Sequence, residues 1–270
     1  MSNDYTNNDI QRLGEDGAAK DRLFVTALAR GLELLRCFSP GERHLGVAEL
    51  SRRTGIPKPS VSRLAGTLTK LGYLNFVPSL GKYSLGSGVL SLGYAMLSNI
   101  SIRQVARPLM QELAEYSQAS VSIGICDRLS MVYIETVRSN APIGIRRGVG
   151  SRLPLAPTAI GRAYLAGLPK AEQDFLMHQL FLRDEKNWPQ LRAGIEQGLR
   201  DYAERGFCLS IGEWERDVSA VGVPFMDAEG RSMAFSCGGA AFLLTRDRLE
   251  HDIGPRLVSL VQHIGGIGRI

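Results

Sequence analysis

The 270-residue sequence has few cysteines, and they are not arranged for a disulfide framework or a metal site. No CxxC pair is present and no histidine stands at ligand spacing from any of the four, Cys37, Cys126, Cys208 and Cys237. Structural zinc and disulfides are therefore not expected, and we interpret the cysteines as small buried hydrophobes. A functional role is left open for Cys208 and Cys237, without being favoured.

Long hydrophobic runs are also missing. No apolar stretch is long enough to span a membrane, and the first residues do not resemble a signal peptide. We therefore expect no membrane partner and a cytoplasmic location. Residues 1–19 are rich in Asn, Asp and Gly and carry a net charge of −3, so they are predicted to form a disordered tail. The rest, in a chain that is 44% apolar and 22% charged, has the composition of a globular protein.

The common catalytic signatures are absent as well. The sequence contains neither GxSxG, HExxH nor GxxxxGK[ST]. Glu213 and Glu215 flank Trp214 and could act as an acid and a base, although exposed carboxylates are the more common explanation. We therefore expect no enzyme activity, no catalytic residue, no metal and no cofactor.

Residues 48–68, AELSRRTGIPKPSVSRLAGTL, predict two short helices joined by a tight turn. Gly55 should end the first helix, because glycine tolerates the left-handed backbone found past a helix C-terminus. The second helix should start near Lys58, with Pro59 in its first turn, where a missing N–H costs nothing. Helical spacing predicts a buried stripe of Val61, Leu64, Leu68 and Leu71. This layout is typical of a helix-turn-helix, and the alternative is a solvated amphipathic helix.

The residues around this pair favour the DNA-binding interpretation. Strands over 73–77 and 82–85, joined by a turn, predict a wing, and an apolar helix over 27–38 can roof the core. Residues 20–86 hold eleven basic and four acidic residues, a net charge of +7, as expected of a polyanion-binding domain. The predicted DNA-contacting residues are Arg52, Arg53, Lys58, Pro59, Ser60, Ser62, Arg63, Thr67, Lys70 and Lys82. Arg63 suits a guanine edge and Lys82 a phosphate.

The second part of the chain has a different pattern. Residues 87–99 predict an apolar helix that either links two domains and pairs subunits or belongs to the second core. Beyond it, helices alternate with segments of strand period, namely 121–125, 131–137, 143–147, 207–211, 218–225 and 232–237. Helices are predicted over 102–116, 158–167, 170–181, 188–205 and 245–264. Residues 100–270 are therefore predicted to form an α+β, sensor-like domain.

Five blocks of sequence, in this order and spacing, resemble the IclR-type bacterial transcription regulators over roughly residues 24–265. They are ARGLELLRCF, LSRRTGIPKPSVSRLAGTLTKLGYL, KYSLGSGVLSLG, GVGSRLPLAPTAIGRAYLAGLP and RGFCLSIGEWERDVSAVGVPFMDAEGRSMAFSCGG. The resemblance implies a winged helix-turn-helix domain, a linker helix and a GAF-like α/β effector-binding domain. It also implies homodimers or homotetramers, double-stranded DNA as a partner and a small organic effector, often a carboxylate or an aromatic compound.

The resemblance further implies which residues line an effector pocket. They are Thr158, Ala159, Ile160, Ser210, Glu213, Ala220, Ser236, Cys237 and Gly238. In this family, a histidine often stands at the position of Ala156-Pro157, an aspartate at Ser210 and a cysteine at Ala220. Each departure removes a polar or reactive group, so our hypothesis is a roomier, more apolar pocket than a two- or three-carbon acid needs.

Three functions remain in view from the sequence. The first is a ligand-responsive transcription factor, repressor or activator, that binds a palindromic promoter site as a homo-oligomer. The second is an enzyme that converts its ligand, against which the missing catalytic signatures argue. The third is a constitutive DNA-binding dimer whose C-terminal domain only oligomerises.

Overall fold

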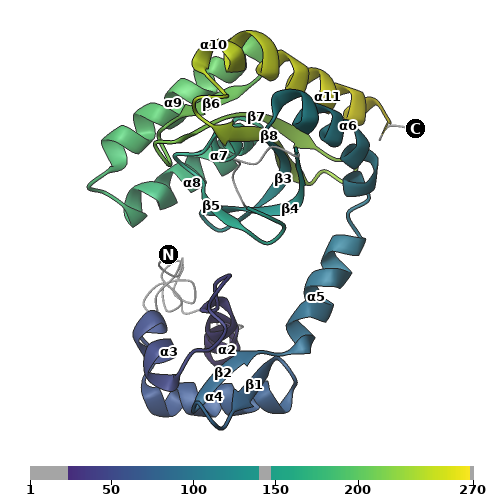
Figure 1. The fold of residues 1–270 in the computed structure, drawn as a ribbon. Helices are drawn as coiled ribbons and strands as arrows, with labels where there is room; N and C mark the ends of the chain where they lie inside the picture. The colour runs from purple at the N-terminus through teal and green to yellow at the C-terminus, as the bar shows by residue number, and fades with distance from the viewer. Residues whose placement is uncertain (1–23, 140–146, 268–270) are drawn as a thin grey trace. The chain divides into compact units, whose positions relative to one another are not determined.

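A computed structural model describes residues 24–139 and 147–267 (Figure 1). The chain divides into two compact units, one ending at Asn99 and the other starting at Ile100. Within the described residues, no helix is both long enough and apolar enough to cross a bilayer. The tail predicted over 1–19 and all but the last residue of the strand predicted over 143–147 lie outside the described residues.

In the described residues, the part of the first unit before α5 (Ser87–Ser98) is built from three helices and a two-stranded sheet. Helices α2 (Thr26–Arg36), α3 (Val47–Thr54) and α4 (Lys58–Lys70) are followed by strands β1 (Leu74–Val77) and β2 (Lys82–Leu85). The two strands pair antiparallel. The predicted helix pair and the predicted wing are therefore confirmed.

The turn between α3 and α4 is fixed by its own side chains. Gly55 has a φ of 70°, the left-handed conformation expected of a helix-ending glycine. The Ser51 hydroxyl donates to the Ile56 carbonyl at 2.7 Å, and the Thr54 hydroxyl accepts from the Ile56 amide at 3.2 Å. Ile56 itself is fully buried between the helices. These contacts hold α4 at a fixed angle to α3.

Two details of the predicted core are wrong. Leu71 is 64% exposed, because α4 ends at Lys70, and Ala65 is fully buried in the stripe instead. On α2, Leu34 is buried, whereas Leu28 and Leu32 are exposed and do not roof the core. Within the described residues, an apolar side of α2 therefore remains exposed.

Helix α5 (Ser87–Ser98) confirms the predicted apolar helix. Its start is tied to the first unit, because Gly86 N–H donates to the Tyr73 carbonyl at 2.9 Å and Gly88 N–H to the Gly72 carbonyl at 3.1 Å. None of its residues is buried against the described chain. It belongs to the compact unit that ends at Asn99.

The second unit is built around a six-stranded antiparallel sheet, with strand order β5-β4-β3-β8-β7-β6. The five predicted strands that lie in the described residues are present, but a short edge strand at 152–154 was missed, because three residues are too few to show a period. The strands are β3 (Ser120–Asp127), β4 (Ser130–Arg138), β5 (Arg152–Pro154), β6 (Cys208–Ile211), β7 (Val218–Met226) and β8 (Ser232–Ala240).

Helices cover both faces of this sheet (Figure 1). Helices α6 and α11 pack on one face, and α7 packs on the other, with α8 and α9 outside it. The helical elements are α6 (Ile102–Ser117), α7 (Ala159–Ala166), α8 (Lys170–Arg183), α9 (Trp188–Arg205), α10 (Arg246–Arg248), a π-helical segment η1 (Leu249–Ile253) and α11 (Gly254–Ile267). The predicted α+β organisation is confirmed.

Helix α7 lies directly against the sheet. A side chain at Gly222 on β7 would place its Cβ 2.4 Å from the Ala159 carbonyl oxygen, so only glycine fits there. A Cβ at Gly161 would lie 1.9 Å from the Leu155 carbonyl oxygen, so this position also requires glycine. These contacts hold the first turn of α7 at the centre of the sheet face, where the unit has its cavity.

Candidate functional site

The exposed face of α4 carries most of the predicted DNA contacts. Its opposite face is fully buried at Val61 and Ala65 and nearly so at Leu68. Ser60 is half-buried, and the other predicted residues of the helix are exposed, namely Lys58, Pro59, Ser62, Arg63, Thr67 and Lys70. Lys82 is exposed on the second strand of the wing.

The acidic residues of the first unit leave this face positively charged. In residues 24–99, acids occur at Glu33, Glu42 and Glu49 alone, and each pairs with an arginine of α2 or α3. No acid of the described chain forms an ion pair with the cations of α4 or with Lys82. The net positive charge of the unit is therefore concentrated on the recognition helix and the wing.

Arg53 has a structural role, contrary to the predicted DNA contact. Its guanidinium donates to both carboxylate oxygens of Glu42, at 2.6 and 2.7 Å, to Glu49 at 2.6 Å and to the Cys37 carbonyl at 2.9 Å. These bonds use its donors inside the protein, and only 20% of the side chain is exposed. The same hydrogen bonds lower the pKa of Glu42 to about 2. Arg52, which pairs with Glu49 at 2.5 Å, remains 71% exposed.

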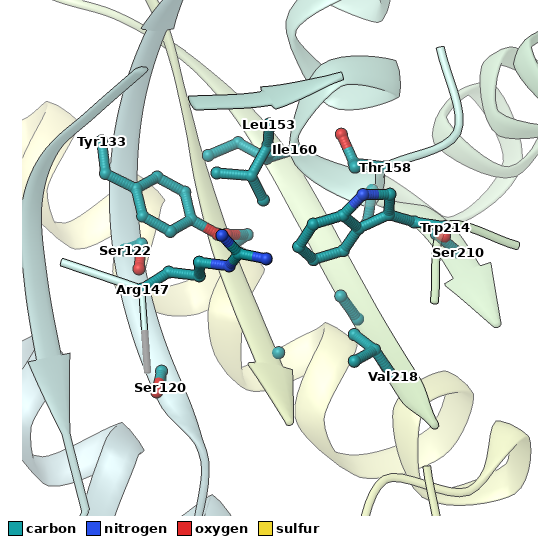
Figure 2. A pocket seen from close by; sticks show the side chains of 14 residues that line it. Ser120, Ser122, Tyr133, Arg147, Leu153, Thr158, Ile160, Ser210, Trp214 and Val218 are labelled. Atoms are coloured by element: carbon teal, nitrogen blue, oxygen red, sulfur yellow. The ribbon is translucent and has the colours of Figure 1, made fainter. Parts of the chain in front are cut away.

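The second unit contains a cavity between the first turn of α7 and the sheet (Figure 2). It encloses about 480 Å³, counting its open mouth. One part of the lining is hydroxyl-bearing: Ser120, Ser122, Tyr133, Thr158, Ser210 and Ser236. Another part is apolar: Leu153, Ala159, Ile160, Trp214, Val218 and Ala220. Gly238 and Arg147 complete it.

Seven of the nine residues predicted to line a pocket do line this cavity: Thr158, Ala159, Ile160, Ser210, Ala220, Ser236 and Gly238. The structure places Glu213 and Cys237 elsewhere. The Glu213 carboxylate accepts two hydrogen bonds from Arg162, at 2.5 and 2.8 Å. Cys237 lies between two cavity-facing residues of β8, so strand alternation turns its thiol to α6, 3.5 Å from the Ser117 hydroxyl.

The buried thiols are protonated at neutral pH. Burial raises the pKa of Cys237 to about 11 and that of Cys208 to about 12. Neither thiol lines the cavity, so neither is placed to react with a ligand there. No cluster of three or more metal-ligating side chains occurs in the described ranges.

Arg162 positions the loop that closes one side of the cavity. Its side chain is 3% exposed and donates to the carbonyls of Ala156, at 3.1 Å, and Leu209, at 2.8 Å, besides Glu213. Because Glu213 precedes Trp214, the anchored carboxylate holds the indole against the cavity. Nothing in the sequence pattern distinguishes Arg162 from an exposed arginine of a helix.

The remaining lining residues had weaker signals in the sequence. Ser120 and Ser122 alternate along β3 and could have been assigned to one sheet face by their period. Tyr133 on β4 contacts Ser122 and Ser236, and burial raises the pKa of its hydroxyl. Arg147 is the last residue of the strand predicted over 143–147, and that strand pattern does not indicate a place in a cavity.

Comparison with known proteins identifies both units. The family model for the IclR helix-turn-helix domain matches residues 27–78, and the model for the C-terminal domain of bacterial IclR transcriptional regulators matches residues 94–264. This chain belongs to the IclR family. The predicted fold class is that of the family, and the chain is a DNA-binding transcriptional regulator.

Full-length relatives of this IclR-family chain support the assignment. It is 35% identical to the HTH-type transcriptional regulator TsaQ1/TsaQ2 of Comamonas testosteroni, over 89% of this chain and 87% of the relative. It is 30% identical to the Pca regulon regulatory protein of Pseudomonas putida, over 87% and 81%. The crystal structure of an IclR-family regulator from Brucella abortus matches with a TM-score of 0.88 and 49% identity, over 96% and 98%. These relatives are named as regulators, in agreement with the expectation that this chain is not an enzyme.

Proposed function

We propose that this IclR-family regulator binds a palindromic promoter site as a homo-oligomer and changes its affinity for that site when a small organic effector occupies the cavity. The effector is a carboxylate or an aromatic metabolite. The observation that carries the proposal is the cavity itself, lined by hydroxyls, an indole and one arginine, in a chain whose other unit carries a recognition helix.

The DNA contacts come from α4, the wing and the end of α3. Because Arg53 is used internally, the contacts assigned here are Arg52, Lys58, Pro59, Ser60, Ser62, Arg63, Thr67, Lys70 and Lys82. Arg63 reads a base edge, since its long guanidinium is exposed and has no acidic partner in the described chain. Lys82 contacts a phosphate from the wing.

Exposed apolar residues of the first unit support subunit pairing. Helix α5 carries no charged residue, and its Leu90, Leu92 and Tyr94 are 74%, 60% and 72% exposed. Leu28 and Leu32 on α2, with Val25 just before the helix, add an exposed apolar stripe. Apolar surface of this extent is unusual in a monomer. A symmetric pair of these units would present two recognition helices about 34 Å apart, matched to successive major grooves.

The cavity suits an effector larger than a two- or three-carbon acid. Ala220 is small, and the Ser210 hydroxyl is turned aside to donate to the Pro157 carbonyl at 2.7 Å. The remaining hydroxyls can bind polar substituents while Trp214 and Ile160 contact a ring. Calorimetry that finds tight binding of glyoxylate or pyruvate and none of aromatic acids would contradict this assignment.

The experiment that tests the whole proposal is a mobility shift on DNA from the chain's own promoter. A thermal-shift screen of metabolites on the full chain first identifies ligands, because a bound ligand raises stability by mass action. We expect a ligand from this screen to change the DNA affinity, in a direction that distinguishes induction from co-repression. DNA binding that no bound ligand alters would favour a constitutive dimer instead. Analytical ultracentrifugation tests the oligomer, and a monomer would remove the basis for a palindromic site.

A further inference from the structure

Arg147 sets the charge of the cavity. Among the described residues that line the cavity, it alone carries a formal charge. Figure 2 shows its guanidinium reaching across the cavity between the Tyr133 ring and the Trp214 indole. The guanidinium carbon lies 5.4 Å from the centroid of the indole. A planar cation beside an aromatic face suits a ligand with a carboxylate next to a ring.

The ion pair that holds Arg147 is weak. Its Nη2 atom lies 3.2 Å from Oε1 of Glu215, and the two side chains are 35% and 45% exposed. Exposed pairs of this kind contribute little and exchange readily, because water screens them. The Arg162–Glu213 pair differs, since its arginine is 3% exposed and the contact is bidentate. A carboxylate that enters the cavity can therefore replace Glu215 at Arg147 but not Glu213 at Arg162.

The loop between β6 and β7 gives Glu215 its position. Glu213, Trp214 and Glu215 are consecutive: the first is anchored to Arg162, the second lines the cavity, and the third pairs with Arg147 at its rim. The loop thus places an internal carboxylate beside the one cation of the described lining. If a ligand carboxylate takes the place of Glu215 at Arg147, the loop that carries Trp214 loses its contact with Arg147.

Tyr133 supplies a second donor on the same side. Its hydroxyl contacts Ser122 and Ser236, and the Arg147 charge acts on it. Burial raises the pKa of this phenol, so the hydroxyl keeps its proton at neutral pH and can donate to an anion. The first turn of α7 is the competing anion seat, but the Thr158 hydroxyl there is already engaged with Gly161 and Pro154.

We propose that Arg147 binds the carboxylate of an aromatic acid effector, and that this carboxylate displaces Glu215 from the guanidinium. This inference rests on the proposed ligand-responsive function and adds to it the residue that selects an acid over a neutral compound. The ring of the ligand lies against Trp214, and the chain's own Glu215 competes with the ligand.

Calorimetry on the full chain tests the inference with benzoate and phenylacetate, each against its neutral amide. We expect the acids to bind roughly ten- to a hundred-fold more tightly than the amides, as for a hydrogen bond to a charged group. Arg147→Met should abolish this preference. Glu215→Gln should raise the affinity for the acids about two- to five-fold, which is the contribution of an exposed ion pair, and leave the amides unchanged. Arg152→Met is the matched control, because Arg152 pairs with Asp127 and does not line the cavity.

Three outcomes overturn the inference: neither acid binds, acid and amide bind equally, or the preference survives in Arg147→Met. The last outcome would assign the anion to the first turn of α7.

A failure of the proposed regulatory function would give a different result. A neutral metabolite that alters DNA binding would keep the effector function and overturn the role of Arg147. If the wild-type chain did not bind its promoter specifically, the proposed regulatory function would be wrong, whereas the preference for acids over amides measured by calorimetry could still hold.

Discussion

The two units of this regulator use arginine in different ways. In the first unit, the acids pair with Arg36, Arg52 and Arg53, so the cations of the recognition helix are left for DNA. In the second unit, an acid anchors the buried Arg162, and the cavity arginine is held only by an exposed carboxylate. An arginine's function therefore depends on which acid it meets in the fold. The residue type alone does not reveal it.

The largest effect expected from this comparison is on the stability of the second unit. Arg162→Met removes a buried guanidinium and leaves the Ala156 and Leu209 carbonyls without their donors. We expect the free energy of unfolding to fall by roughly 2–6 kcal/mol, because each of the two buried carbonyls left without a donor costs about 1–3 kcal/mol. Urea denaturation followed by Trp fluorescence measures it. Glu213→Gln is the control and should cost much less, since that side chain is 42% exposed. A loss below about 1 kcal/mol in Arg162→Met would place Arg162 among the dispensable arginines.

The next effect concerns DNA binding in the first unit. Arg63→Ala should weaken specific promoter binding by roughly 1–3 kcal/mol, because a bidentate base contact is worth that much. Its melting temperature should not change, since Arg63 is exposed and has no acidic partner in the described chain. Fluorescence anisotropy with promoter and scrambled DNA measures both affinities.

Lys82→Ala is the matched comparison for Arg63→Ala. A phosphate contact from the wing should weaken promoter and scrambled DNA alike and lower the salt-dependence slope by about one. If Arg63→Ala lowered the affinity for promoter and scrambled DNA equally, Arg63 would contact a phosphate and not a base. No loss on either would remove it from the interface.

Substitution of Arg53 should have a smaller effect, and it should change stability instead of DNA affinity. Arg53→Met should lower the free energy of unfolding of the first unit by roughly 1–2 kcal/mol, because three hydrogen-bonded groups lose a charged donor. The affinity of the folded fraction for DNA should stay unchanged. Thermal unfolding and anisotropy on one preparation separate the two readouts. Reduced DNA affinity at full stability would restore Arg53 to the interface and break the comparison.

Much of the first unit could be predicted from the sequence, because local rules determine it. Gly55 and Pro59 mark a helix end and a helix start, and helical spacing gives the buried face. The errors at Leu71 and Arg53 have different causes. Leu71 lies one residue past the end of α4, and Arg53 meets Glu42 only after the chain has folded back.

The cavity was less predictable, since segments far apart in the sequence build it. Strand alternation gave most of the sheet, and the family resemblance gave seven lining residues. The resemblance could not give orientation: Glu213 and Cys237 lie in the right segments, but their side chains point elsewhere. Arg147 and Tyr133 carried no signal of a shared site, because only the folded sheet and the β6–β7 loop bring Arg147, Tyr133 and Trp214 together.

The smallest effect expected is a pH dependence that sharpens the structural role of Arg53. Hydrogen bonds from Arg53 lower the pKa of Glu42 from 4.5 to about 2, so the folded state favours the carboxylate. A lowered pKa gives stability that is complete above the unfolded pKa and is lost as the pH falls through the folded one. Glu42→Gln should therefore lower the melting temperature of the first unit by a constant amount above pH 4.5, and this difference should shrink as the pH falls toward 2. In an Arg53→Met background the same substitution should have a much smaller effect, because only the hydrogen bonds between Glu42 and Ser39 then remain to lower this pKa. A difference that persists at pH 2, or one that is undiminished without Arg53, would show that Glu42 acts through another contact.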